Sequence, residues 1–188
     1  RLSASRGVIR ADTPGAYAQA VHWVRDIQAK ADRDAVALGL VVENFIPGRE
    51  YALEGLLQDG RLRVLALFDK PDPLDGPYFE ETLYLTPSRL EPQQQQAITL
   101  AVQRACELVG LASGPIHAEM RANAHGIWLL EIAARSIGGL CGRVLRQALG
   151  TQRGAPDPDQ QQVPKAPSPA YLAGEGQHGL AGLFDLSG

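Results

Sequence analysis

The sequence predicts an α+β fold in which an antiparallel β-sheet is flanked by helices. Residues 114–139 and residues 51–70 each contain two runs of alternating apolar and polar residues, separated by a break that contains glycine. This pattern is typical of β-hairpins. Apolar residues recur at spacings of three and four after Thr13 and after Ser88, which predicts two amphipathic helices beside the sheet.

The length and composition of the chain predict one domain followed by a tail. The chain has 188 residues and a net charge of −3. After residue 150, proline, glutamine and glycine replace most apolar residues, so we expect residues 1–150 to form the domain and residues 151–188 to be mostly disordered. The charge gives no reason to expect nucleic acid or an anionic membrane as a partner, and no apolar run approaches the length of a membrane span.

The two cysteines give an expectation about the compartment. Cys106 and Cys141 lie in predicted helices and lack the spacing of metal ligands. We therefore expect reduced, partly buried thiols in a cytoplasmic protein.

The helices and strands have recognisable boundaries. Thr13 and Pro14 form a helix start, and this helix should bury one face and end near Ala29. Residues 88–110 predict a second helix, and residues 140–150 a third. Residues 35–45 form an apolar run that predicts a strand, and Asp59-Gly60 is the preferred two-residue turn of a hairpin.

The hairpin of residues 114–139 contains two glutamates whose relative position depends on its loop. If residues 124–126 form a three-residue loop with Gly126 in the left-handed conformation, Glu119 lies directly opposite Glu131. A two-residue or four-residue loop would shift the register by one and separate the two carboxylates. Opposed like charges destabilise a sheet unless something lies between them, and Mg²⁺ is held by carboxylates together with substrate phosphates. The hairpin alone allows two interpretations, a metal–nucleotide site or a solvated sheet face with exposed glutamates.

The same residues carry a resemblance to a known superfamily. Glu119, the run from Leu129 through Glu131 to Arg135, and the pair at 138–139 resemble the metal-binding end of ATP-grasp proteins. Members of that superfamily join a carboxylate to an amine or a similar nucleophile through an acyl phosphate. The resemblance implies that Glu119 and Glu131 hold Mg²⁺ or Mn²⁺ and that Arg135 neutralises phosphate or a developing oxyanion. Ala133 departs from the family, whose members commonly have Asn at this position.

Residues 43–50, which we call the hinge segment, resemble the ATP-grasp hinge. The resemblance implies that Glu43 and the backbone of Ile46 contact adenine and that Glu50 contacts the ribose. A backbone donor and acceptor on an extended segment can match the edge of adenine. Without the resemblance, the alternative is a strand that leaves the core through a Pro-Gly turn and has exposed glutamates.

Two further segments are assigned by the resemblance. Ser5, Arg6 and Gly7 resemble the phosphate-covering loop, with an ordinary polar turn as the alternative. The strand before such a loop normally supplies an ATP-contacting lysine, and the sequence starts at Arg1, after that position. Lys70 lies in a Pro-rich charged region where the family contacts the transferred phosphate, and the alternative is a solvated loop lysine.

The resemblance implies the larger, C-terminal part of an ATP-grasp fold that binds ATP and Mg²⁺ for ligation of a small-molecule carboxylate to an amine. The other class of function is a nucleotide-binding or interaction module without turnover, which Ala133 and the absent lysine strand support. An unpaired strand edge at residues 8–10 would also favour self-association into a homo-oligomer.

Overall fold

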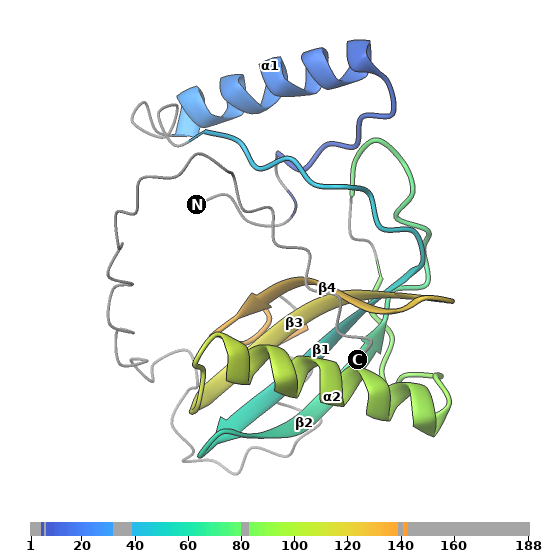
Figure 1. The fold of residues 1–188 in the computed structure, drawn as a ribbon, viewed down its shortest axis with the longest axis vertical. Coiled ribbons are helices and arrows are strands. Elements are labelled where there is room, and N and C mark those ends of the chain that lie inside the picture. The colour runs from blue at the N-terminus through green and yellow to red at the C-terminus, as the bar shows by residue number, and fades with distance from the viewer. Residues whose placement is uncertain (1–4, 6, 32–38, 80–82, 139–140, 143–188) are drawn as a thin grey trace.

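The computed structural model describes residues 5, 7–31, 39–79, 83–138 and 141–142 of the chain. Its elements are α1 (Pro14–Ala31), β1 (Arg49–Gln58), β2 (Arg61–Asp69), α2 (Pro92–Leu108), β3 (Gly114–Asn123) and β4 (Gly126–Ala133). The strands form one antiparallel sheet in the order β2-β1-β3-β4 (Figure 1). The predicted antiparallel α+β fold is confirmed.

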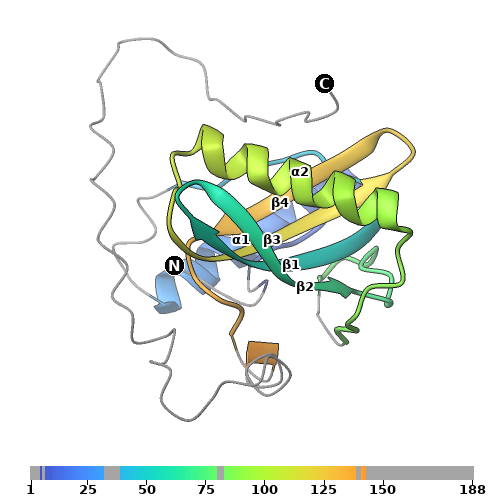
Figure 2. The same cartoon turned by 90° about the horizontal axis from the view of Figure 1, so that it is seen from below.

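Helix α2 covers one face of the sheet (Figure 2). Leu53 of β1 and Met120 of β3 point toward it and are fully buried, as are Ile98 and Val102 on the facing side of α2. The period of two in the strands and the spacing of three and four in the helix place these side chains in one core.

The ends of α2 follow from local sequence. The helix begins at Pro92, four residues after the predicted start, with Glu91 at the N-cap. It ends at Leu108 with Val109 as the C-cap, and Gly110 follows with a φ of 74°, which lies in the left-handed region. The amide of Gly110 donates to the carbonyl of Glu107 at 3.2 Å, and the amide of Leu111 donates to that of Cys106 at 2.9 Å. These two bonds form the Schellman motif, so the predicted end is confirmed.

Helix α1 lies on the side of the sheet opposite α2 (Figures 1 and 2). The Thr13 hydroxyl accepts a hydrogen bond from the amide of Ala16 at 3.2 Å, which is the predicted N-cap. The predicted single buried face is wrong, because Ala20 is the only buried residue among positions 14–30 of this helix, and Tyr17 and Trp23 are exposed. The reason is that α1 faces an open cleft instead of packing against the sheet.

Both predicted hairpins form, but the loop predicted for the second is wrong. Asp59 and Gly60 connect β1 and β2 with φ of 50° and 77°, as expected for a turn of this type. In the β3–β4 hairpin, Asn123 pairs with Gly126, so the loop has two residues. An irregularity between Glu119 and Met120 then places one extra residue in β4. This bulge shifts the register back, and Glu119 pairs with Glu131 as predicted.

Residues 35–45 were predicted to form a strand, but residues 39–45, the part that the structure describes, do not form one. Residues 39–48 belong to no strand, and the side chain of Val41 is 84% exposed. An apolar run therefore did not distinguish a buried strand from an extended segment that lines a cleft.

The segments at the two ends of the chain bear on the predicted strand edge, the predicted third helix and the predicted tail. Ile9 forms an antiparallel bridge with Tyr78, and the Arg10 amide donates to the Pro77 carbonyl at 3.0 Å. The edge at residues 8–10 is therefore partly paired, which removes part of the reason for self-association. The helix predicted at 140–150 lies almost wholly outside the described residues, and the tail at 151–188 lies outside them entirely.

Candidate functional site

The face of the sheet that points away from α2 is charged. In the ladder between β1 and β3, Glu50 pairs with Arg121 and Glu54 pairs with His117. All four side chains are buried, and Arg121 and Glu54 are each only 2% exposed. Buried charges of this kind are stable only when they are paired.

Lys70 follows β2 and lies between two carboxylates. Its Nζ is 2.8 Å from Glu50 Oε1 and 2.9 Å from Glu119 Oε1, and the residue is 6% exposed. Burial opposes the charge of Lys70, but the attraction of Glu119 and Glu50 outweighs burial and raises the pKa of the ammonium well above its usual range. The alternative of a solvated loop lysine is therefore wrong.

His117 connects Glu54 to Glu119. Its Nδ1 contacts Glu54 Oε1 closely, and its Nε2 lies 3.4 Å from Glu119 Oε1. Glu54 Oε2 also accepts a hydrogen bond of 3.0 Å from the amide of Ile137, which fixes the segment after β4. Burial would lower the pKa of the His117 imidazole, but the hydrogen bonds to Glu119 and Glu54 raise it to about 9.

The two predicted metal ligands are brought together across β3 and β4. Burial opposes the charge of Glu119, but the hydrogen bond from His117 and the Lys70 ammonium lower its pKa to about 2, so it is an ionised carboxylate. Its contacts with Lys70, Tyr84 and His117 all involve Oε1. Glu131 is exposed, and its Oε1 lies 3.5 Å from a nitrogen of Arg135.

This donor set fits a hard cation that is completed by other ligands. Ionised carboxylate oxygens are what Mg²⁺ and Mn²⁺ prefer, and Mg²⁺ is commonly bound by one or two carboxylates with phosphates and water. Among the described residues there is no group of three His, Cys, Asp or Glu side chains that could hold a metal. The protein part of such a site would therefore be the Glu119–Glu131 pair.

The hinge segment lies along the pocket and is fastened to β3. The Ile46 carbonyl accepts a hydrogen bond of 2.9 Å from Arg121 Nη1. Glu43 is exposed, as the alternative interpretation expects, but Glu50 is buried and each of its oxygens contacts a cation, Oε1 with Lys70 and Oε2 with Arg121.

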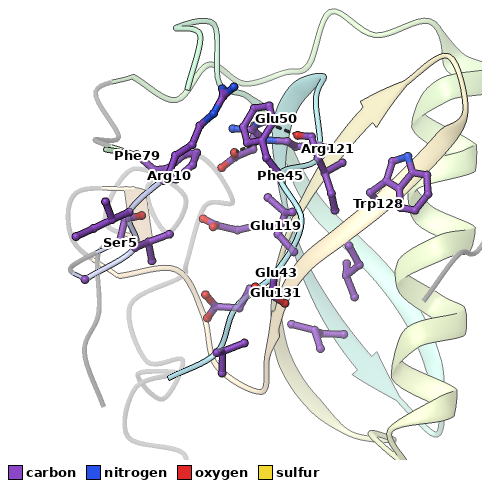
Figure 3. Close-up of a pocket in the computed structure, with 18 of the residues that line it drawn as sticks. Ser5, Arg10, Glu43, Phe45, Glu50, Phe79, Glu119, Arg121, Trp128 and Glu131 are labelled. Atoms are coloured by element: carbon purple, nitrogen blue, oxygen red, sulfur yellow. Dashed lines mark hydrogen bonds and ion pairs between the residues drawn. The ribbon is translucent and has the colours of Figure 1, made fainter. Parts of the chain in front are cut away.

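The N-terminal segment closes another side of the pocket. Ser5 and Gly7 have φ of 54° and 89° and belong to a turn in which the Val8 amide donates to the Ser5 carbonyl. The guanidinium of Arg10 lies 3.8 Å from the ring centre of Phe45, which holds this segment against the hinge (Figure 3). Arg6 lies outside the described residues.

These elements line one pocket of about 1490 Å³, which is bounded by α1, the hinge segment and the charged face of the sheet and extends to the C-terminal end of α2. Figure 3 shows Glu43, Glu119 and Glu131 among its lining residues. The predicted site residues that line it are Ser5, Gly7, Glu43, Ile46, Glu50, Glu119, Glu131 and Arg135. Lys70 lies behind Glu50 and Glu119 and does not line it.

Sequence reasoning missed Glu54, His117 and Arg121. All three stand in strands at positions that alternate with core residues, and this alternation does not show whether a polar side chain is buried or which partner it has. The one available signal was that Glu54 interrupts an almost continuous apolar strand, which predicts burial on both faces.

No helix among the described residues is long and apolar enough to cross a membrane.

Comparison with known proteins shows the family. Residues 1–144 match the family model of the ATP-grasp domain. Carnosine synthase 1 of Homo sapiens is 30% identical over 128 residues, which are 66% of this chain and 15% of that protein. The crystal structure of L-amino acid ligase from Bacillus licheniformis is 31% identical with a TM-score of 0.66, and the match covers 74% of this chain and 35% of that one.

A more distant structure shares the fold alone. The biotin carboxylase domain of 2-oxoglutarate carboxylase from Hydrogenobacter thermophilus, solved with MgADP and bicarbonate, is 15% identical with a TM-score of 0.57. The match covers 82% of this chain and 36% of that one. The chain thus spans only a part of each of these relatives. Together with the antiparallel sheet and the opposed glutamates, the match over residues 1–144 shows that the chain belongs to the ATP-grasp domain family.

Proposed function

We propose that this domain binds Mg-ATP in the pocket and provides the ATP-activating part of a carboxylate–amine ligase. The observation that carries the proposal is the Glu119–Glu131 pair, in which an ionised carboxylate and an exposed one stand opposite each other at the wall of the pocket. The two relatives with about 30% identity are named carnosine synthase 1 and L-amino acid ligase, that is, a synthase and a ligase.

The proposed chemistry has two balanced steps. A carboxylate oxygen of the substrate attacks the γ-phosphorus of ATP, and ADP leaves, which gives an acyl phosphate. The amine nitrogen of the second substrate then attacks the acyl carbon, inorganic phosphate leaves, and the amine loses a proton. Both substrates are small molecules, with no role for nucleic acid or a membrane.

Each named residue has a defined part in this proposal. Glu119 and Glu131 would hold the metal ion, Mg²⁺ or Mn²⁺, which would supply neutralisation of the phosphate charge. Arg135, next to Glu131, neutralises the phosphate or the developing oxyanion. Lys70 is engaged with Glu50 and Glu119, so it would contact a phosphate only by exchanging one of these ion pairs.

The nucleotide itself is proposed to contact two segments. Glu43 and the Ile46 backbone meet the adenine, and Glu50 meets the ribose. Ser5, Arg6 and Gly7 cover the phosphates, because small residues let backbone amides approach anionic oxygens. Cys106 is a buried thiol, which fits a reducing compartment, and we propose the cytoplasm.

A second function remains open, in which the domain binds nucleotide without turnover. The observation that favours it is Ala133, which replaces a common family ligand. Formation of ADP in the presence of candidate carboxylates and amines separates the two functions. No ADP with any acceptor, despite binding, would favour the binding module.

The test of the metal site uses Glu131→Gln, because Glu131 is exposed and the substitution should leave the fold intact. Titration calorimetry should show that Mg²⁺ tightens ATP binding in the wild type, and that Glu131→Gln loses about tenfold or more of Mg-ATP affinity. The matched control is Glu107→Gln, an exposed glutamate of α2 outside the pocket. Equal Mg-ATP affinity in all three proteins would refute the metal assignment.

A further inference from the structure

We infer that Arg121 is a positioning residue that fixes the hinge segment for recognition of the nucleotide base. This inference rests on the proposed nucleotide site and adds the residue that would set its selectivity for the base. Arg121 would act through the peptide groups around Ile46 instead of by touching the base.

Three chain segments converge on the Arg121 guanidinium. Nε donates to Glu50 Oε2 at 3.1 Å, Nη1 donates to the Ile46 carbonyl at 2.9 Å, and Nη2 donates to the Leu74 carbonyl at 2.7 Å. A guanidinium is planar and rigid and stays charged at any accessible pH. Because each of its nitrogens has a different partner, the relative position of β1, the hinge segment and the loop after Lys70 is fixed.

Two aromatic rings lie near this guanidinium. Its central carbon lies 4.9 Å from the ring centre of Phe45 and 5.6 Å from that of Phe79. The two rings stack on each other with centroids 6.4 Å apart (Figure 3). Phe45 directly precedes Ile46, so these contacts fix the same stretch of the hinge that the hydrogen bonds hold.

A second side chain of β3 fastens the next residue of the hinge. Asn123 lies two residues after Arg121, and its Nδ2 donates to the Pro47 carbonyl at 2.8 Å. Gly48 follows with φ of 131°, and a Cβ there would lie 2.4 Å from the Ala122 carbonyl oxygen. Only glycine allows this close approach. The carbonyls of residues 46 and 47 are thus both held by side chains of one strand.

This arrangement matters for selectivity because base recognition by backbone groups depends on their exact placement. Supporting contacts that hold such groups before the ligand arrives reduce the cost of binding. Lysine at position 121 would keep the positive charge but could not bond three segments with a planar fork. Replacing Arg121 by lysine should therefore weaken the binding of the base and leave the binding of the phosphates unchanged.

The test compares wild type, Arg121→Lys and the control Arg104→Lys, which changes an exposed arginine of α2. Calorimetry measures the dissociation constants of Mg-ATP, Mg-GTP and Mg-tripolyphosphate, the last of which has no base. We expect Arg121→Lys to weaken Mg-ATP about tenfold, to lower the preference for ATP over GTP, and to leave tripolyphosphate within about twofold. Arg104→Lys should bind all three like the wild type.

Three outcomes would overturn the inference. An unchanged ATP-to-GTP ratio would show that Arg121 does not position the base, and an equal loss for all three ligands would show a purely structural role. If Arg121→Lys does not fold, Asn123→Ala provides the test, because Asn123 is more exposed and its removal is less disruptive. This variant should lower the ATP-to-GTP preference to a smaller extent. An unchanged preference in Asn123→Ala would refute the inference. Failure of the wild type to bind any of the three ligands would instead refute the proposed nucleotide site.

Discussion

The two central strands, β1 and β3, are buried on both faces, but the two faces are built from opposite chemistry. Leu53 and Glu54 are neighbours in β1, are 0% and 2% exposed, and point to opposite sides. The face toward α2 is filled by apolar side chains, whereas the other face is filled by ion pairs. Burial alone therefore does not show what a residue contributes, and the partner of each side chain must be known.

The charged face is a row of alternating signs. Its members, in spatial order, are Glu54, His117, Glu119, Lys70, Glu50 and Arg121. The desolvation of each buried ion costs several kcal/mol, and pairing largely offsets this cost without adding much net stability. The apolar face, by contrast, stabilises the fold in proportion to the area it removes from water. We interpret the ion pairs of the charged face as contacts that position side chains at the pocket.

The largest expected effect comes from removing the cation at the centre of the row. Lys70→Met leaves Glu50 and Glu119 buried with fewer compensating partners, and breaking a buried ion pair costs about 3–5 kcal/mol. Chemical denaturation at pH 7 should show a loss of this order in the free energy of unfolding.

The pH dependence of the loss is the control for Lys70→Met, because it separates a contribution from charge from a contribution from packing. Carboxylates that lack Lys70 can be protonated at low pH, so the destabilisation by Lys70→Met should become smaller between pH 7 and pH 4. A loss that stays constant over this range would mean that Lys70 contributes packing instead of charge.

The next largest effect is expected from a substitution on the apolar face of the sheet. Leu53→Ala removes a fully buried side chain from the core, for which losses of about 2–5 kcal/mol are typical. Unlike Lys70→Met, this loss should not depend on pH. Leu100→Ala in α2 is the matched control, because Leu100 is 60% exposed and its removal should change stability by less than about 0.5 kcal/mol. Equal losses at both leucines would contradict the assigned core.

The apolar face could be predicted from the sequence, because alternation and helical spacing identify residues that need only a nonpolar environment. Leu53, Met120 and Val102 need no particular partner, so a pattern is sufficient. Helix α1 shows the limit of this reasoning, since its apolar spacing is regular but Ala20 is the only buried residue among its positions 14–30.

The charged face could be predicted only in part. The opposition of Glu119 and Glu131 was predicted from a three-residue loop, whereas the structure reaches it with a two-residue loop and a bulge at β4. A bulge has no local sequence signal here, so the correct pairing came from an incorrect loop. The partners of Lys70 and Arg121 lie 20 to 75 residues away, and single-sequence patterns carry no information about such contacts.

The smallest expected effect tests His117, which lies between Glu54 and Glu119 in the row. Its folded pKa of about 9 lies above the unfolded value near 6.5, so protonated His117 stabilises the fold fully below pH 6.5. This contribution is lost as the pH rises through 9. Glu119 acts in the opposite sense, because its folded pKa of about 2 lies below the ordinary 4.5, and its contribution is lost as the pH falls from 4.5 through 2.

Stability should therefore be greatest between pH 4.5 and pH 6.5, where both groups contribute fully. From pH 6 to pH 9.5 the unfolding free energy of the wild type should fall by on the order of 1–3 kcal/mol, since one pKa unit corresponds to about 1.4 kcal/mol. His117→Gln should flatten this slope, because glutamine can donate to Glu54 but has no proton to lose. His22→Gln changes an exposed histidine of α1 and should keep the wild-type slope. If His117→Gln also keeps it, the imidazole is not the titrating group, and the charge of Glu54 must be compensated by other contacts.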